Sequence, residues 1–121
     1  MNKMIGGLAS GAALVLLLPA VRAGEPLSYA QAQALMSHYG CPACHALDRS
    51  IKGTPSLLDI AHRYRSDPNA IEELAIHVHN GSVGVFGPRP MPPVDVPQGD
   101  LQTILKWILQ LPLEPSGSEA S

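Results

Sequence analysis

The sequence predicts an all-α protein, and three observations support that prediction. Four segments repeat apolar residues with helical spacing, and no segment alternates apolar and polar residues as a half-buried strand does. Between the last two of these segments lies a stretch rich in proline and glycine, residues that interrupt helices and strands alike. The chain has 121 residues, so about four helices would form one small domain.

The first predicted helix covers residues 28–39. Ser28 followed by Gln31 is the pattern of a capping box, in which the two side chains satisfy backbone N–H groups at a helix start. This helix leads directly into the segment that holds both cysteines. The second helix is predicted from apolar residues spaced i, i+3, i+4 and i+7, namely Leu57, Ile60, Ala61 and Tyr64.

The third predicted helix begins at Asp67, a capping residue that is followed by Pro68, and ends at the Asn80–Gly81 pair. Its apolar residues have the same spacing and are Ile71, Leu74, Ala75 and Val78. The fourth helix is closed by Pro112, because proline cannot continue a helix. Its apolar stripe consists of Leu101, Ile104, Leu105 and Ile108, widened by Trp107 and Leu109.

The connection between the third and fourth helices is unusual. Residues 81–97 read GSVGVFGPRPMPPVDVP, with three glycines and five prolines. Such a segment is too long and too stiff for an ordinary connection, and long ordered loops are commonly functional.

The first 23 residues have the pattern of a secretory signal peptide. Lys3 gives a positively charged start, Leu8–Leu18 is an apolar run, and Ala23 offers a small-residue cleavage position. A membrane anchor is the alternative, but the run is shorter than the roughly 20 residues that span a bilayer. We therefore expect cleavage after about Ala23, no stable membrane insertion, one domain over 24–113 and a disordered tail over 114–121.

The charge of the chain excludes one class of partner. Eight Lys and Arg stand against ten Asp and Glu, for a formal net charge of −2. Removal of residues 1–23 takes away Lys3 and Arg22, so six basic residues remain against ten acidic ones, which gives −4. Nucleic-acid binding requires a basic footprint, so we expect none, and an acidic surface predicts partners with a basic face. A domain this small commonly needs a disulfide, metal or cofactor in its core.

The only two cysteines lie in CPACH, residues 41–45, which matches Cys-x-x-Cys-His, the attachment signature of c-type haem. Two thiols on one turn can bond to the two vinyl groups of a single porphyrin, and the adjacent imidazole can then bind the iron. A thioredoxin-like redox pair would need a βαβ setting. A zinc site would need four ligands, and a disulfide would close too small a loop to restrict the unfolded chain much.

Haem iron has two axial positions, and His45 is predicted to take one. Met and His are the usual candidates for the other. Met36 lies in the first predicted helix, where methionine normally packs in the core. Met91 lies in PRPMPPV, where four prolines stiffen the backbone around one thioether, so Met91 is the predicted second ligand. The alternative is a stiff surface loop with an incidental methionine.

Four segments, YGCPACHAL, KGTPSLLDIAHRY, NGSVGVFGPRPMPP and LKWILQL, resemble in this order the small soluble bacterial class I cytochromes c. The resemblance covers essentially the whole chain after residue 23. It implies a small cytochrome c fold, with about four helices wrapped around one covalently bound haem. It also implies thioether links at Cys41 and Cys44, the axial ligands His45 and Met91, and a hydrogen bond from the imidazole N–H to the carbonyl of Pro55.

The resemblance implies a periplasmic electron carrier, not an enzyme, whose haem iron cycles between Fe(II) and Fe(III). We expect a monomer that exchanges electrons with redox partner proteins, such as a donor dehydrogenase, a reductase or an oxidase. One alternative is a haem-c electron-transfer subunit of a periplasmic dehydrogenase or oxidase complex. Another is a haem enzyme that binds peroxide or a gas, which would need an open sixth position on the iron.

The chain also departs from the family. Phe86 stands where relatives often carry tryptophan, so an indole hydrogen bond to a haem propionate is lost. Val94 stands where many relatives carry asparagine, and cannot hydrogen-bond the ligand sulfur. His77 stands where a basic side chain is frequent, and is either a neighbour of a propionate or a solvated helix residue. In the family the first and last helices cross, and Trp107 would pack near the haem edge.

Overall fold

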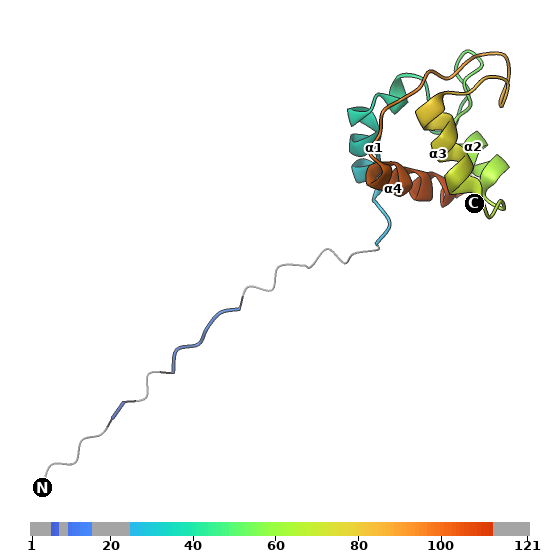
Figure 1. The fold of residues 1–121 in the computed structure, drawn as a ribbon. Helices are drawn as coiled ribbons and strands as arrows, with labels where there is room; N and C mark the ends of the chain where they lie inside the picture. The colour runs from blue at the N-terminus through green and yellow to red at the C-terminus, as the bar shows by residue number, and fades with distance from the viewer. Residues whose placement is uncertain (1–5, 8–9, 16–24, 113–121) are drawn as a thin grey trace, which may run out of the picture.

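The structure is a computed structural model that describes residues 6–7, 10–15 and 25–112. The predicted signal peptide lies mostly outside the described residues, and its cleavage position and the predicted tail over 114–121 lie wholly outside them. In the described part of the chain we find four α-helices, one 3₁₀ turn and no strand, which confirms the all-α prediction (Figure 1). None of these helices has the length and hydrophobicity that crossing a bilayer requires.

Helix α1 (Tyr29–His38) begins at the predicted capping box. The backbone N–H of Gln31 donates to Ser28 Oγ at 3.2 Å, and the N–H of Ser28 donates to Gln31 Oε1 at 2.9 Å. Beyond the helix, Gly40 has φ +78°, a left-handed conformation that glycine adopts without steric cost. The chain then enters the 3₁₀ turn η1 (Cys41–Ala43), so α1 and Gly40 together place the cysteine motif.

Helix α2 (Leu57–Tyr64) has the predicted apolar spacing, and it also has a capping box that was not predicted. Ser56 Oγ accepts the N–H of Asp59 at 3.0 Å, and Asp59 Oδ2 accepts the N–H of Ser56 at 2.9 Å. This backbone hydrogen bond is the main reason that the pKa of the Asp59 carboxyl lies below its ordinary value. The box fixes the point at which the preceding loop ends.

Helix α3 (Ala70–Asn80) starts later than predicted, and the assignment of Asp67 as its N-cap is wrong. Asp67 Oδ1 accepts the N–H of Asn69 at 2.8 Å, which makes a separate turn before the helix. Competition of this kind between a side chain and helical hydrogen bonding is typical of aspartate. The helix ends at Gly81, as predicted, and α4 (Gln98–Leu109) ends shortly before Pro112.

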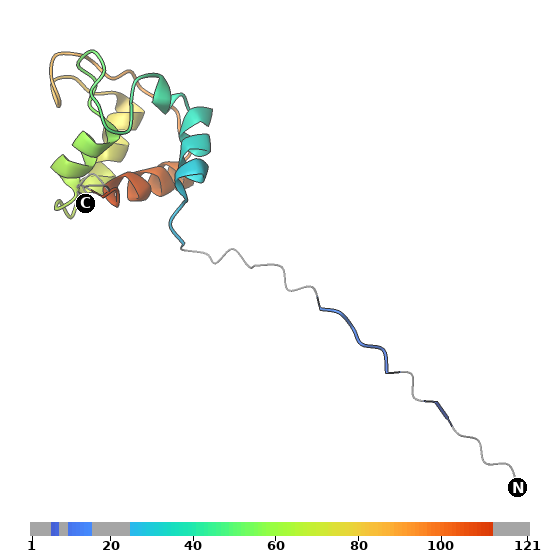
Figure 2. The same cartoon turned by 180° about the vertical axis from the view of Figure 1, so that it is seen from behind.

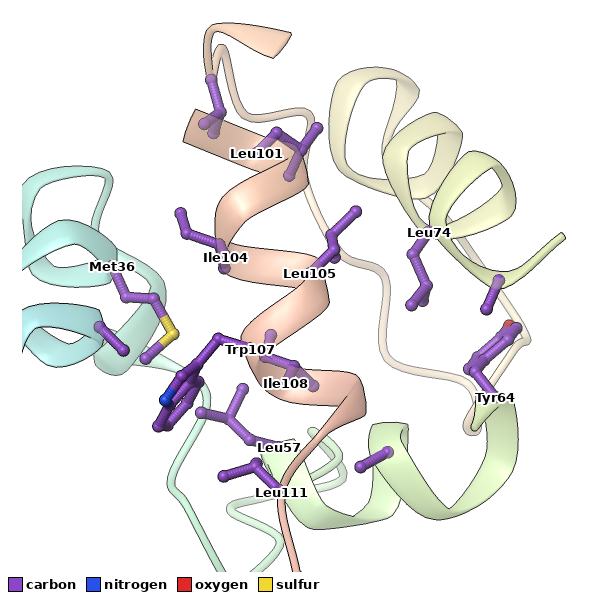
Figure 3. Close-up of a cluster of buried hydrophobic side chains, with 14 residues drawn as sticks. Met36, Leu57, Tyr64, Leu74, Leu101, Ile104, Leu105, Trp107, Ile108 and Leu111 are labelled. Carbon is purple, nitrogen blue, oxygen red and sulfur yellow. The ribbon is translucent and has the colours of Figure 1, made fainter. Parts of the chain in front are cut away.

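Helix α4 contacts the other three α-helices and organises the core. Figure 3 shows Met36 of α1 on one side of α4, and Leu74 of α3 and Tyr64 of α2 on the other side. The buried residues of α4 are Leu101, Ile104, Leu105, Trp107 and Ile108. Each such side chain contributes about 1.5–3 kcal/mol when it is fully buried, so α4 is the main support of the fold.

Two loops lie together on the side of the helices that faces away from α4, in both views of the fold (Figures 1 and 2). The first joins η1 to α2, and the second joins α3 to α4 over residues 81–97. The two loops come from distant parts of the sequence and carry most of the residues that were predicted to be functional.

Candidate functional site

A cavity of about 280 Å³ lies between the two loops and the helices. Its wall is mainly apolar. Apolar side chains reach it from α2, α3, α4 and the second loop, namely Tyr64, Leu74 and Val78, Leu105, and Phe86. A smaller cavity of about 60 Å³ shares four lining residues with it: His45, Val78, Met91 and Leu105. The two cavities are therefore adjacent, and we call them together the apolar hollow beside α4.

The predicted site residues gather around this hollow. Cys44, His45, Pro55 and Met91 line the larger cavity, and Cys41 lines the smaller one. They come from the η1 segment, from the loop before α2 and from the loop after α3.

The imidazole of His45 is held by one hydrogen bond. Its Nδ1 lies 2.9 Å from the carbonyl oxygen of Pro55. A carbonyl oxygen can only accept, so Nδ1 must donate, and in the neutral ring Nε2 then keeps a free lone pair. An imidazole fixed in this tautomer is prepared to bind a metal ion through Nε2.

The two thiols are free and differ in environment. Cys41 is half-buried and Cys44 is exposed. Burial raises the pKa of the Cys41 thiol. A thioredoxin-like redox pair depends on a thiol whose pKa is lowered, so this environment argues against such a pair.

Met91 is positioned by backbone hydrogen bonds from α3 and the segment that follows it. The N–H of Met91 donates to the carbonyl of Ser82 at 2.8 Å, and the N–H of Ser82 donates to the carbonyl of Met91 at 3.1 Å. Three residues further on, the N–H of Val94 donates to the carbonyl of Val78 at 2.8 Å. The Met91 segment is thus held by hydrogen bonds to the end of α3, in addition to the stiffness expected from its prolines.

Gly81 brings these two segments close together. It has φ +72° and ψ 171°, a region that is essentially restricted to glycine. A Cβ atom at this position would lie 2.7 Å from the carbonyl oxygen of Met91 and 3.0 Å from Pro93 Cδ. From the sequence, Gly81 was predicted only as a helix stop, and its contact with the Met91 segment was not anticipated.

Besides His45, two basic side chains line the cavity. His77 and Arg89 are among its lining residues, and none of its lining residues is acidic. Arg89 Nη1 donates to the carbonyl of Lys52 at 3.0 Å, which joins the two loops to each other. The guanidinium of Arg63 lies 4.9 Å from the ring centre of Phe86. A group with carboxylates at its edge would be favourable here.

Met36 and Trp107 lie on the α1 side of α4. Met36 is 1% exposed, as expected of a core methionine. Trp107 was expected near the haem edge, but it is not among the residues that line either cavity. Its ring centre lies 6.1 Å from that of Tyr29, and Figure 3 shows it beside Met36. The indole therefore supports the contact between α1 and α4.

No protein-family model matches the chain. Cytochrome c-551 of Pseudomonas aeruginosa is 43% identical over 77 residues, which cover 64% of this chain and 73% of that protein. Cytochrome c-552 of Nitrosomonas europaea is 42% identical over 85 residues, which cover 69% of this chain and 82% of that protein. The chain belongs to the small class I cytochromes c. Cytochromes c are electron carriers that hold haem c covalently, and Cys41 and Cys44 fit that attachment motif.

Solved structures agree with this family. The crystal structure of wild-type cytochrome c552 from Nitrosomonas europaea superposes with a TM-score of 0.60 at 37% identity, covering 64% of this chain and 96% of that one. A class 1 cytochrome, MtoD from Sideroxydans lithotrophicus, is 24% identical and shares the fold with a TM-score of 0.52. The prediction of a cytochrome c fold is thereby confirmed.

The residues around the hollow fit a haem. The wall is apolar where a porphyrin plane would need it, and basic side chains lie where carboxylates could be placed. One imidazole and one thioether face the same cavity, which is a donor pair suited to haem iron.

Proposed function

We propose that this cytochrome c is a periplasmic electron carrier with one haem c, and that the axial ligands of its iron are His45 and Met91. The observation that carries this proposal is that a tautomer-fixed imidazole and a methionine with a pinned backbone line one apolar cavity. The bound haem would supply one-electron chemistry, by cycling its iron between Fe(II) and Fe(III).

The residues of the chain have separate tasks in this proposal. Cys41 and Cys44 attach the cofactor, and Pro55 holds the ring of His45 so that its Nε2 can bind iron. The backbone hydrogen bonds between Ser82 and Met91 hold the residue that carries the thioether at the cavity. The apolar wall excludes water, which limits reorganisation when the charge of the site changes.

Two other functions remain alternatives. A haem enzyme would need a sixth position that is open to peroxide or a gas, whereas the segment around Met91 is tied to the end of α3 at both Met91 and Val94. A permanent subunit of a dehydrogenase or oxidase complex would use the same residues to hold its haem. The two functions differ in whether the protein is free in the periplasm or bound in a complex.

The absorption spectrum of the purified ferric protein tests the axial ligands. A weak band at the red end of the spectrum, characteristic of methionine bound to ferric haem, is the expected result, together with slow binding of cyanide. A spectrum without this band, combined with rapid cyanide binding, would show an open site and favour the enzyme.

The proposed compartment requires removal of the signal peptide. We propose that residues 1–23 are cleaved after about Ala23 and that residues 24–113 form the periplasmic domain. Mass spectrometry of the protein from a periplasmic fraction should give a chain that begins at Gly24 and carries one haem. Gel filtration of the same fraction separates a free monomer from a permanent subunit, which would elute with its complex.

A further inference from the structure

The peptide group between Pro55 and Ser56 connects the ring of His45 to a carboxylate. Its carbonyl oxygen accepts the Nδ1–H of His45 at 2.9 Å. Its N–H, which belongs to Ser56, donates to Oδ2 of Asp59, also at 2.9 Å. All peptide bonds among the described residues are trans, so the C=O and N–H of this planar group point in opposite directions. Asp59 and the imidazole of His45 are therefore the two ends of one hydrogen-bonded chain.

The surrounding backbone holds this chain of hydrogen bonds in place. Ser56 is 1% exposed, so the peptide group that it shares with Pro55 is largely shielded from water. Ser56 Oγ accepts the N–H of Asp59 at 3.0 Å, which fixes the first turn of α2. The N–H of Leu57 donates to the carbonyl of Ala46 at 2.9 Å. The residue after His45 is thus bonded to the segment that carries the peptide group.

The carboxylate at the far end is ionised at neutral pH. The N–H of Ser56 is the main reason that the pKa of Asp59 lies below its ordinary value, and Ser50 Oγ donates to the same Oδ2 atom at 2.9 Å. Hydrogen bonds in a chain polarise one another, most strongly where water is excluded. The charge of Asp59 therefore makes the carbonyl oxygen of Pro55 more negative, and a stronger acceptor for the ring of His45.

A comparison with the other capping box of the chain shows what is particular here. In α1 the reciprocal side chain is that of Gln31, which is neutral. In α2 it is that of Asp59, and it bonds the peptide group on which His45 depends. Both boxes stabilise a helix start, but that of α2 also brings a full negative charge to the support of a predicted iron ligand.

We propose that Asp59 is a positioning residue that lowers the reduction potential by acting through the Pro55–Ser56 peptide group on His45. This proposal rests on the proposed function, in which His45 binds the iron. A stronger acceptor at Nδ1 makes Nε2 a more basic ligand, as a carboxylate does when it bonds a metal-binding histidine directly. A more basic ligand donates more electron density to the iron and favours Fe(III) over Fe(II).

The reduction potential of the holoprotein at neutral pH tests this role. Asp59→Asn keeps a side-chain oxygen that can accept the N–H of Ser56, but it removes the charge. At a fixed ambient potential, the ratio of Fe(II) to Fe(III) should rise by about threefold in this variant.

Two control variants separate this effect from others. Asp48→Asn removes an equal charge only three residues from His45, and the Asp48 carboxylate does not bond the Pro55–Ser56 peptide group. It should change the ratio by less than about 1.5-fold, because Asp48 is exposed and its charge is screened. Ser56→Ala removes the hydroxyl that caps Asp59 and leaves the backbone N–H in place. It should lower stability in urea without a change in the ratio.

The NMR resonance of the Nδ1 proton of His45, recorded in the reduced holoprotein, provides a second readout. A weaker hydrogen bond should move it upfield in Asp59→Asn and leave it in place in both controls. An unchanged ratio in Asp59→Asn would overturn the proposal. An equal rise in Asp48→Asn would assign the effect to charge acting through space, and a rise in Ser56→Ala would assign it to a loosened helix start. If the proposed function itself failed, the wild type would show no reversible Fe(II)/Fe(III) titration.

Discussion

Substitution of Gly81 by alanine should detach the Met91 segment from the end of α3. The new Cβ would lie 2.7 Å from the carbonyl oxygen of Met91, an atom of the backbone that cannot rotate away. The backbone at φ +72° and ψ 171° costs a residue other than glycine about 1–3 kcal/mol. Overpacking adds about 1–3 kcal/mol. We therefore expect a loss of about 2–6 kcal/mol in the free energy of unfolding, or a displaced Met91 if the loop yields first.

Two measurements distinguish these responses. Urea unfolding followed by circular dichroism gives the stability, and the red-end band of the ferric protein reports methionine bound to iron. Gly87→Ala is the matched control, because Gly87 lies in the same loop, outside the cavity lining, and has φ +134° but a Cβ atom added there would have nothing within 4 Å. It should show the backbone cost alone and keep the band. If Gly81→Ala were as stable as Gly87→Ala and retained the band in full, the contact of Gly81 with the Met91 segment would have no role in holding the ligand.

Three further changes test other parts of the account. Replacing Cys41 and Cys44 together by alanine should abolish covalent haem, so a haem-stained band surviving on a denaturing gel would contradict the attachment. The capping hydrogen bond from the Ser56 N–H lowers the pKa of Asp59. The contribution of this group to stability should therefore be fully present above the ordinary pKa of 3.8 and be lost as the pH falls through the lower folded pKa. Asp59→Asn should reduce this loss of stability at low pH, measured by thermal melts at several pH values. An unchanged loss in the variant would show that other groups cause it. The Tyr39 hydroxyl donates to Asp100 at 2.5 Å, and this hydrogen bond raises the pKa of Tyr39. The stability that it contributes should therefore be lost as the pH rises above the ordinary value of 10.0 and through the higher folded pKa. Tyr39→Phe should remove this decline in the same melts, and a decline that persists in the variant would belong to another group.

The parts of the fold that depend on local sequence could be predicted. The capping box at Ser28 and the helical spacing from Leu57 act within a few residues, so the starts of α1 and α2 agree with the structure. Asp67 was misplaced because a capping side chain can also close a turn, and the sequence alone does not distinguish these outcomes. The gathering of five predicted site residues around the cavities follows from packing of distant segments. The haem-attachment signature and the proline-rich segment predicted that four of them would share one haem, and the family resemblance added Pro55.

Other features of the site left no readable trace in the sequence. The pairing of Ser82 with Met91 uses backbone atoms only, so no side chain reveals it. Arg89 reaches across to the carbonyl of Lys52, 37 residues away in the chain.

The reduction potential of Met91→Ala, compared with that of Met36→Leu, tests the central claim most directly. Both variants lose a thioether, but Met36 lies in the core at 1% exposure, and a change to leucine of similar volume costs less than about 1.5 kcal/mol. The account predicts that Met91→Ala keeps its haem, loses the red-end band and has a lower potential, because the thioether favours Fe(II). Met36→Leu should keep the band and the potential. An unchanged potential and spectrum in Met91→Ala would show that Met91 is not the iron ligand and would contradict the proposed carrier.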